Sequence, residues 1–414
     1  MRIALLSLLA ACGTSAPVVE ITIDRDHPGA RIPDDFAGAS YETSTVIGGA
    51  YFRADNAPLL ATFAKLGLRH LRIGGNEADV GDLPAAGDID ALLAFADASH
   101  VPLIYTLRAK TIDPDGAAAI AHAMLDRDAA RLECFSIGNE PDHYAAYADY
   151  RTIVTSYMDT IADARARYCG PDALPPDYVT QYATDFAPRG TIAEITIHEY
   201  FGGGGQGIAP ADARAKLLSP AIRDAYAHEH DAWAPAIEAA HLTYRIDETN
   251  SFANGGAPGA SDTFASTLWG LDYLHWWARA GAIGIDFHTG DHVSGATTTY
   301  PLFVTDGSGY AIRPLAYAVM AFELGSHGRT IPVTIDTTDL TAYAVVTDDG
   351  TIALTIISTA DGPRTLHLAE LDPVDAHRVT APAIDATSVT FGEAESIGNT
   401  FTIDPMSAIV VHYR

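Results

Sequence analysis

Residues 134–142 read CFSIGNEPD, an apolar run that ends in Gly138, Asn139, Glu140 and Pro141. A short apolar run closed by glycine and proline is typical of a buried β-strand followed by a loop. Barrels of parallel strands carry functional side chains at the C-terminal ends of those strands. The stretch therefore predicts a barrel strand that presents Glu140 and its neighbours to a site.

A second stretch, residues 244–250, reads YRIDETN and closes another strand with Glu248. Counted along the chain, this strand is the seventh, whereas Glu140 closes the fourth. Strands four and seven of an eight-stranded barrel lie roughly across its mouth from each other. Both carboxylates can therefore reach one small molecule.

Further runs rich in β-branched and aromatic residues alternate with segments of helical period, as in βα units around a parallel sheet. The eight expected strands cover residues 35–43, 70–75, 103–109, 134–139, 178–184, 194–200, 242–248 and 284–288. Helices are expected at 58–66, 89–99, 147–167, 262–280 and 314–324. The sequence thus predicts an α/β fold, a (β/α)₈ TIM barrel over residues 28–325.

The C-terminal part has a different pattern, with short alternating strands at 340–346, 352–358, 389–391 and 408–413. Such strands separated by turn residues are typical of an antiparallel sheet. Residues 326–414 are therefore predicted to form a β-sandwich. Residues 18–24 alternate in the same way, so the N-terminal segment 12–27 is expected to join that sandwich.

The charge of the chain excludes one class of partner. The chain has 25 Lys and Arg against 53 Asp and Glu, a formal net charge of −28. This excess repels nucleic acid and other polyanions. We expect no nucleic-acid partner.

The first residues, MRIALLSLLAACG, combine one positive charge with an apolar run too short to span a bilayer. Residues 1–11 are expected to be a lipoprotein signal peptide, because residues 9–13 resemble the bacterial lipobox, in which the cysteine is lipidated. Cys12 would then anchor an exported bacterial lipoprotein in the periplasm or at the cell surface, and membrane contact would occur only through that anchor. The alternative is an ordinary secretory signal with an incidental Cys12.

Two further cysteines, Cys134 and Cys169, remain in a chain expected to be exported. Export permits disulfides, and the expected strand and helix order places both residues at the same end of the barrel. The sequence is compatible both with a disulfide between Cys134 and Cys169 and with two buried free thiols.

The two strand-end carboxylates suit one chemistry. Hydrolysis of a glycosidic bond needs a proton for the leaving group and a carboxylate that stabilises an oxocarbenium-like centre. Glu140 and Glu248 can supply this pair, one protonated and the other ionised. A surface glycan-binding protein without hydrolysis is the alternative from another class, although binding alone does not require such a pair.

The motif IGNEP at 137–141 resembles the acid/base motif of clan A glycoside hydrolases, whose nucleophile is expected on the seventh strand. The resemblance therefore implies that Glu140 is the general acid/base and Glu248 the nucleophile of a retaining enzyme. The segment ETNSFANGGAPGASDTF at 248–264 is similar to the nucleophile segment of glycoside hydrolase family 79, which contains β-glucuronidases and heparanase. Further matches are LRIGGN at 71–76, HEY at 198–200 and YP at 300–301.

The resemblance implies roles for seven further residues. Asn139 would contact the sugar 2-hydroxyl, and Tyr200 would hydrogen-bond the nucleophile. The backbone of Asn254 and Gly255, with Tyr300, would receive the glucuronate carboxylate. Glu42 would contact the 3- or 4-hydroxyl and Arg72 would orient a catalytic carboxylate; for these two, a buried salt bridge is the alternative.

The expected activity is that of an exo-β-glucuronidase, which releases terminal glucuronic acid, with or without a 4-O-methyl group, from glycans. Lys and Arg are too scarce near the motifs to hold a sulfated polymer. Other clan A specificities, xylosidase, galactosidase or arabinofuranosidase, are the alternatives, because peripheral loops decide the sugar. We expect no cofactor and no metal, since the histidines lack a ligand spacing.

Overall fold

The computed structural model describes residues 18–293, 296–368 and 371–414. The expected signal peptide 1–11 and the expected lipidation site Cys12 lie outside the described residues. Within the described ranges, no helix is long and apolar enough to cross a membrane.

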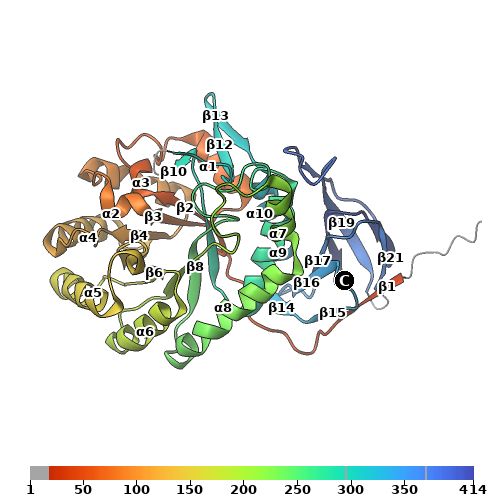
Figure 1. Cartoon of the computed structure of the whole chain (residues 1–414), viewed down its shortest axis with the longest axis horizontal. Coiled ribbons are helices and arrows are strands. Elements are labelled where there is room, and N and C mark those ends of the chain that lie inside the picture. Colours follow the sequence, from red (N-terminus) through yellow and green to blue (C-terminus); the bar gives the residue numbers. More distant parts are fainter. Residues whose placement is uncertain (1–17, 294–295, 369–370) are drawn as a thin grey trace, which may run out of the picture.

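The larger part of the chain is a barrel of eight parallel strands surrounded by helices (Figure 1). The strands are β2 (Ala37–Glu42), β3 (His70–Gly74), β4 (Leu103–Leu107), β5 (Leu132–Ile137), β6 (Pro171–Ala173), β7 (Ile195–Glu199), β8 (Tyr244–Thr249) and β9 (Gly284–His288). Their order is β5-β4-β3-β2-β9-β8-β7-β6, and a parallel bridge between Phe135 and Tyr168 closes the remaining gap. The predicted fold class is confirmed.

Helices cover the outside of the barrel: α1 (Ala57–Leu66), α2 (Asn76–Val80), α3 (Ala86–Ser99), α4 (Pro114–Asp128), α5 (Tyr147–Ile161), α6 (Pro176–Phe186), α7 (Pro210–Leu218), α8 (Pro220–Ala239), α9 (Phe264–Ala280) and α10 (Pro314–Gly325). Helix α1 shows why they form. The Asn56 side chain accepts from the Leu59 N–H at its start, and Gly67 ends it in the left-handed conformation.

The prediction for the fifth strand was wrong. Residues 178–184 lie in α6, which begins with Pro176 and buries Tyr178, Val179, Tyr182, Ala183 and Phe186. That spacing is one face of a helix, although the aromatic and β-branched content favoured a strand. The actual strand, β6, has only three residues and pairs with β7. It contains Pro171 and Asp172, two residue types that are rare in strands.

A disulfide joins Cys134 in β5 to Cys169, which lies just before β6. The two residues are 35 positions apart in the sequence and fully buried. They form a small cluster with Ile104 of β4, which pairs with Arg72 of β3 and therefore faces the inside of the barrel. Of the two alternatives that the sequence left open, the structure has the bonded pair.

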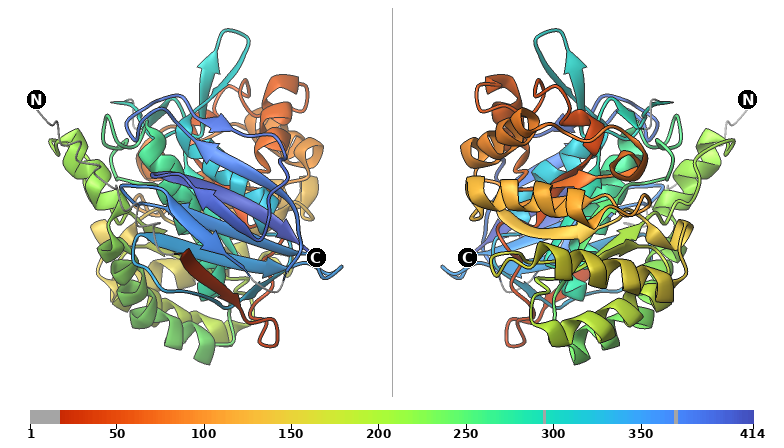
Figure 2. Two further views of the ribbon diagram at one scale, coloured as in Figure 1. Left: turned by 90° about the vertical axis from the view of Figure 1, so that its right-hand side faces the viewer. Right: turned by 90° about the vertical axis from the view of Figure 1, so that its left-hand side faces the viewer.

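The remaining strands build two sheets (Figure 2, left). The six-stranded sheet has the order β14-β16-β17-β22-β19-β20, and the four-stranded sheet has the order β15-β1-β18-β21. Their bounds are β1 (Val18–Ile23), β14 (Arg329–Ile331), β15 (Val333–Ile335), β16 (Leu340–Val346), β17 (Ile352–Ser358), β18 (Arg364–His367), β19 (Pro373–Thr380), β20 (Thr390–Phe391), β21 (Thr400–Ile403) and β22 (Ser407–Tyr413). The N-terminal strand β1 pairs with β15 and β18.

The six-stranded sheet is buried on both faces. Val345, Ile357 and Val410 pack with the barrel core through α9 and α10. Leu354 and Val411, which point the other way, pack with the four-stranded sheet. Because side chains alternate along a strand, this explains why every residue of β17 is buried.

The loops after β9 form two hairpins, β10 (His292–Val293) with β11 (Ala296–Thr297) and β12 (Phe303–Asp306) with β13 (Gly309–Ile312). The second hairpin projects from the barrel in all views (Figures 1 and 2). Between the two hairpins the chain passes through Tyr300, one of the residues with an expected role.

A network of charges closes the N-terminal end of the barrel. His70 of β3 contacts Asp286 through Nδ1 at 2.8 Å and Glu133 through Nε2 at 2.9 Å. Arg245 donates to Glu194 at 3.2 Å nearby. In barrels of this type the N-terminal end serves stability, whereas sites lie at the other end.

Candidate active site

A cavity of about 550 Å³ opens at the C-terminal ends of the barrel strands. Its lining includes two carboxylates, two tyrosines and residues of the loops that follow the barrel strands: Asn76, Glu140, His143, Leu174, Tyr200, Glu248, Asn254, His288 and Tyr300. The structure thus brings Glu140, Glu248, Tyr200, Asn254 and Tyr300 to one cavity. This volume lies in the range of small-molecule sites, about 300–1,000 Å³.

Glu248 lies in β8 and its carboxylate is held on both oxygens. The Tyr200 hydroxyl donates to Oε1 at 2.9 Å, and Arg72 donates to Oε2 at 2.5 Å. Burial raises the pKa of Glu248. Nearby positive charges, of which that of His288 has the largest effect, outweigh burial and leave this pKa well below its usual range. The carboxylate is therefore ionised at neutral pH, as a nucleophile must be.

A local irregularity of β8 gives Glu248 this position. The register of β8 shifts against both neighbouring strands, β7 and β9, close to Asp247 and Glu248. Successive side chains normally point to opposite faces of a sheet, but a bulge changes this. Here both Asp247 and Glu248 contact Arg72 inside the barrel, at 3.5 and 2.5 Å.

Glu140 follows β5 after two residues, in the left-handed conformation with a φ of 45°. Its N–H donates to the Asp172 carbonyl at 2.9 Å, which fixes the backbone. One carboxylate oxygen lies 3.1 Å from Nδ1 of His198 and the other lies 3.2 Å from Nδ1 of His143. The side chain is 12% exposed, so it can exchange protons with the cavity.

Gly138 permits this path of the chain. It has a φ of 82°, and a Cβ there would collide with the Tyr144 hydroxyl. A glycine is therefore required between β5 and Glu140.

The two carboxylates lie close together. One oxygen of Glu140, one oxygen of Glu248 and a ring nitrogen of His198 all lie within 4.8 Å of one another. One sugar carbon and its leaving oxygen can therefore contact both carboxylates at the same time.

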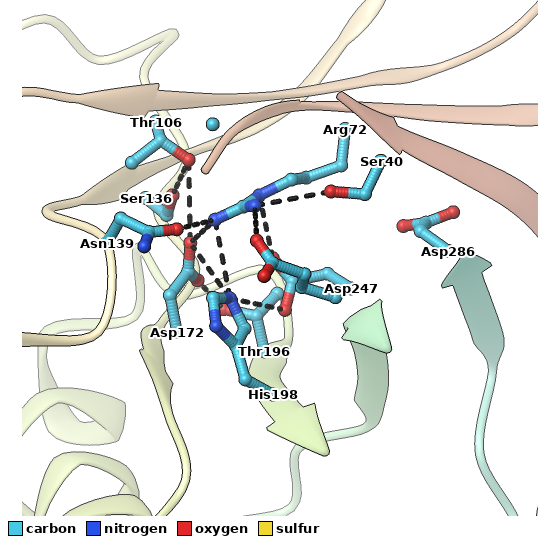
Figure 3. A network of polar contacts seen from close by, with 12 residues as sticks. Ser40, Arg72, Thr106, Ser136, Asn139, Asp172, Thr196, His198, Asp247 and Asp286 are labelled. Carbon is cyan, nitrogen blue, oxygen red and sulfur yellow. Dashed lines mark hydrogen bonds and ion pairs between the residues drawn. The ribbon is translucent and has the colours of Figure 1, made fainter. Parts of the chain in front are cut away.

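Arg72 connects the residues beneath this pair (Figure 3). Its guanidinium donates to Ser40 at 3.2 Å, to Asn139 at 2.8 Å and to Asp172 at 2.9 Å, besides Glu248. Arg72 is fully buried. Arg72 therefore belongs to a buried salt-bridge network that includes Glu248, and its role in orienting that carboxylate stays a prediction.

Asn139 is fixed by two partners. Its N–H donates to Asp79 at 3.0 Å, and its amide oxygen accepts from Arg72. Its Nδ2 has only a long contact of 3.5 Å with Asn76. This leaves the amide N–H group available for a hydroxyl in the cavity.

The turn from Asn254 to Gly256 has three consecutive positive φ angles, of 57°, 85° and 95°. Thr299 donates to the Gly255 carbonyl from its N–H at 2.8 Å and from its hydroxyl at 3.0 Å. Burial and the negative charge of Glu248 raise the pKa of Tyr300 well above its usual value, while the Gly255 N–H acts against them. The Tyr300 hydroxyl is thus a neutral donor beside the turn.

Glu42 and His288 form the wall next to Glu248. Glu42 accepts from the Glu77 N–H at 2.9 Å through Oε2, while Oε1 is buried and has no hydrogen-bond partner. His288 lies 3.7 Å from both carboxylates, Nε2 facing Glu42 and Nδ1 facing Glu248. Burial lowers the pKa of His288, but the two carboxylates outweigh it and the net pKa is raised.

Sequence reasoning assigned no role to four residues that hold the site: Asp79, Asp172, His198 and His288. His288 ends β9 and His198 is the last residue but one of β7, so their position near strand ends was the available signal. Asp172 lies in the strand that the sequence did not reveal. His198 also belongs to two clusters in which carboxylate oxygens and a ring nitrogen are close enough together to hold a metal ion. These clusters are Glu140-His198-Glu248 and Asp172-His198-Asp247. In the second cluster, the Arg72 guanidinium contacts both carboxylates.

Comparisons with known proteins agree with this architecture. No family model matches the chain. A β-glucuronidase from Neurospora crassa is 37% identical over 73 residues, which are 18% of this chain and 13% of that protein. The match therefore spans only a small part of the curated relative.

Solved structures match over nearly the whole length. A 4-O-α-L-rhamnosyl-β-D-glucuronidase from Fusarium oxysporum 12S has a TM-score of 0.74 and 18% identity, over 96% of this chain and 99% of its own. A family 51 arabinofuranosidase from Xanthomonas axonopodis pv. citri has a TM-score of 0.73 and 12% identity, and the match covers 96% of this chain and 100% of that structure. A β-xylosidase from Caulobacter crescentus CB15 has a TM-score of 0.61 and 13% identity, and the match covers 96% of this chain and 99% of that structure.

The predicted resemblance to the β-glucuronidases is confirmed by the Fusarium and Neurospora matches. At such low identities the structural likeness shows the fold, that of a barrel glycoside hydrolase with an attached sandwich. The three solved structures carry names with three different sugars, so the specificity must be argued from the site.

Proposed function

We propose that this chain is a retaining exo-β-glucuronidase. The observation that carries the proposal is the placement of Glu140 and Glu248, which have oxygens within 4.8 Å of each other on one cavity. Retaining enzymes hold their carboxyl groups about 5–5.5 Å apart, and inverting enzymes hold them about 6.5–9.5 Å apart. The close spacing favours direct attack by a carboxylate over attack by a water between the two groups.

The environments of the two carboxylates suit different roles. Glu248, ionised by its neighbours, attacks the anomeric carbon while Glu140 gives its proton to the leaving oxygen. Glu140 then removes a proton from water, and the oxygen of that water displaces Glu248 from the sugar. The Tyr200 hydroxyl keeps Oε1 of Glu248 in line during both steps.

The polar groups around the pair support a sugar with a carboxylate. The Gly255 N–H and the Tyr300 hydroxyl offer two donors without a fixed positive charge beside the catalytic pair. The free N–H group of Asn139 suits the 2-hydroxyl, and the unpaired Oε1 of Glu42 suits another ring hydroxyl. The proposed substrate is a glycan with terminal β-glucuronic acid, with or without a 4-O-methyl group.

Two assays test the proposal. Purified protein is incubated with 4-nitrophenyl β-glucuronide, β-glucoside, β-xyloside, β-galactoside and α-arabinofuranoside. Turnover is expected chiefly for the glucuronide, and proton NMR is expected to show β-glucuronic acid as the first product. An α-configured first product would make the retaining mechanism wrong, and preference for another glycoside would make the sugar wrong. No turnover of any glycoside would favour a glycan-binding protein.

Export and lipid anchoring at Cys12 are a second proposal, supported by the Cys134–Cys169 disulfide, because disulfides persist in oxidising compartments. Expression of the full chain and of Cys12→Ser in a bacterium, followed by fractionation, tests it. The parent is expected in the membrane fraction and Cys12→Ser in the soluble fraction. Equal distribution would contradict a lipid anchor.

A further inference from the structure

The loop after β7 contains four consecutive glycines, Gly202 to Gly205, which lie against the turn that follows β8. The Ala253 N–H donates to the Gly203 carbonyl at 2.9 Å, and Gly204 forms a parallel bridge with Ala253. Gly202 and Gly205 are buried, whereas Gly204 is exposed. The glycines are therefore neighbours of the Asn254–Gly256 turn and not a free linker.

Two of these glycines have no room for a side chain. A Cβ on Gly202 would collide with the Ser251 carbonyl oxygen, and a Cβ on Gly205 would collide with the Gly256 carbonyl oxygen. The Gly205 Cβ would also lie 2.6 Å from the Gly256 carbonyl carbon and 2.9 Å from the Ala257 nitrogen. These are backbone atoms, which cannot rotate away as a side chain can.

The need for glycine at 205 is steric and not conformational. Its φ lies outside the left-handed region, so alanine has no intrinsic backbone strain there. Gly204 provides the contrast, because a Cβ there would have no protein atom within 4 Å. Substitution at 205 therefore pushes on the turn, and substitution at 204 does not.

Helix α7 ties the two loops together from outside. Lys216 donates to the Gly202 carbonyl at 2.7 Å, and Arg214 donates to the Gly259 carbonyl at 2.5 Å. On the other side of the turn, Thr299 holds the Gly255 carbonyl with two hydrogen bonds. The turn is thus clamped between Thr299 and Gly205.

We infer that the Gly202–Gly205 loop is the positioning element that sets the distance of the Asn254–Gly256 turn from Tyr300, and so determines selectivity for a sugar that carries a carboxylate. This inference rests on the proposed function, because it assigns the turn to the carboxylate. Gly205 approaches Gly256 and Ala257, whereas Glu248 is held by Tyr200 and Arg72. A shift of the turn therefore affects binding of the carboxylate more than the chemistry at the anomeric carbon.

The experiment compares Gly205→Ala with Gly204→Ala. For each variant and the parent, kcat/KM is measured with 4-nitrophenyl β-glucuronide and with the β-glucoside, and the melting temperature is recorded. In Gly205→Ala the ratio of glucuronide to glucoside is expected to fall by roughly 10-fold or more, because displacement of binding groups by about 1 Å costs up to about 100-fold. In Gly204→Ala any effect on substrate entry applies to both glycosides, so the ratio stays at the parent value.

A third variant, Lys216→Met, removes the hydrogen bond to Gly202 from an exposed side chain and adds no bulk to the loop. It is expected to lower the same ratio by about threefold, since one hydrogen bond from a charged donor is lost. It decides the question if Gly205→Ala does not fold.

The inference is overturned if Gly205→Ala folds and keeps the parent ratio of glucuronide to glucoside, or if Gly204→Ala lowers that ratio as much as Gly205→Ala does. If Gly205→Ala does not fold, an unchanged ratio in Lys216→Met overturns the inference. A parent that prefers the glucoside would instead refute the proposed function itself, so the two failures are distinguishable.

Discussion

Nδ1 of His198 lies 3.1 Å from Oε1 of Glu140. On its other side, Nε2 of His198 lies 3.3 Å from Nη2 of Arg72 and 3.8 Å from Asp247. Burial lowers the pKa of His198, but Glu248, Glu140 and Asp247 outweigh burial and raise this pKa to about 9. The buried network thus holds the histidine in place, and the histidine contacts the Glu140 carboxylate at the cavity.

His198→Leu removes this contact. Glycosides with poor leaving groups need a well-placed acid, so kcat/KM for an alkyl β-glucuronide is expected to fall by about 10- to 100-fold, the range for one hydrogen bond to a charged group. The fall for the 4-nitrophenyl glucuronide is expected to be clearly smaller. His143→Ala is the control, because His143 contacts the same carboxylate from solvent with 63% of its side chain exposed. Equal losses for both leaving groups would contradict the role.

Glu248→Ala removes the proposed nucleophile. Hydrolysis is expected to fall by at least about 10³-fold, and sodium azide is expected to restore turnover by attacking from the vacated side. The product would be an α-glucuronosyl azide, which NMR identifies. Glu140→Ala provides the matched comparison, because azide would there react with the intact glycosyl-enzyme and give the β-azide. The same azide anomer from both variants would refute the assignment of roles.

Tyr300→Phe deletes one hydroxyl and preserves the ring. If that hydroxyl meets a charged oxygen, its loss costs on the order of 1.5–3 kcal/mol. The kcat/KM for the glucuronide is expected to fall accordingly, while the value for the glucoside barely changes. An unchanged ratio of the two values would remove Tyr300 from the carboxylate site.

The charge network at the opposite end of the barrel predicts a pH-dependent stability. Burial and Arg245 lower the pKa of His70, but Asp286 and Glu133 outweigh them and raise it to about 9. Since the unfolded value is 6.5, the contribution of His70 is complete below pH 6.5 and is lost as the pH rises through about 9. His70→Gln is therefore expected to lower the free energy of unfolding by up to roughly 3 kcal/mol at pH 6 and much less above pH 9. Urea unfolding of parent and variant at both pH values measures the difference, and a difference independent of pH would count against the charged histidine.

The fold and the placement of Glu140 and Glu248 on one cavity could be predicted from the sequence because they depend on local patterns. Apolar runs with helices between them specify a parallel barrel, and Glu140 lies just after β5 while Glu248 lies near the end of β8. Strand β6 was not accessible, because three residues that include a proline carry no periodicity. Its place in the barrel is decided by pairing with β7, which is a tertiary contact.

The supporting residues were not accessible for a related reason. Asp247 precedes Glu248, and simple alternation would turn the two side chains to opposite faces. The shift in register that lets both contact Arg72 depends on the two neighbouring strands. His198 and His288 could be placed at strand ends, but their partners could be identified only after the barrel closed.

The six-stranded sheet with two buried faces has a consequence for how the molecule can be divided. A chain cut after Gly325 would leave the outer surfaces of α9 and α10 bare in water, and the excised sandwich would expose Val345, Ile357 and Val410. We expect neither piece to stay soluble by itself, because a large apolar surface would face water. The barrel and the two sheets are therefore expected to melt as a single cooperative unit, so that a substitution in the six-stranded sheet, far from the cavity, destabilises both.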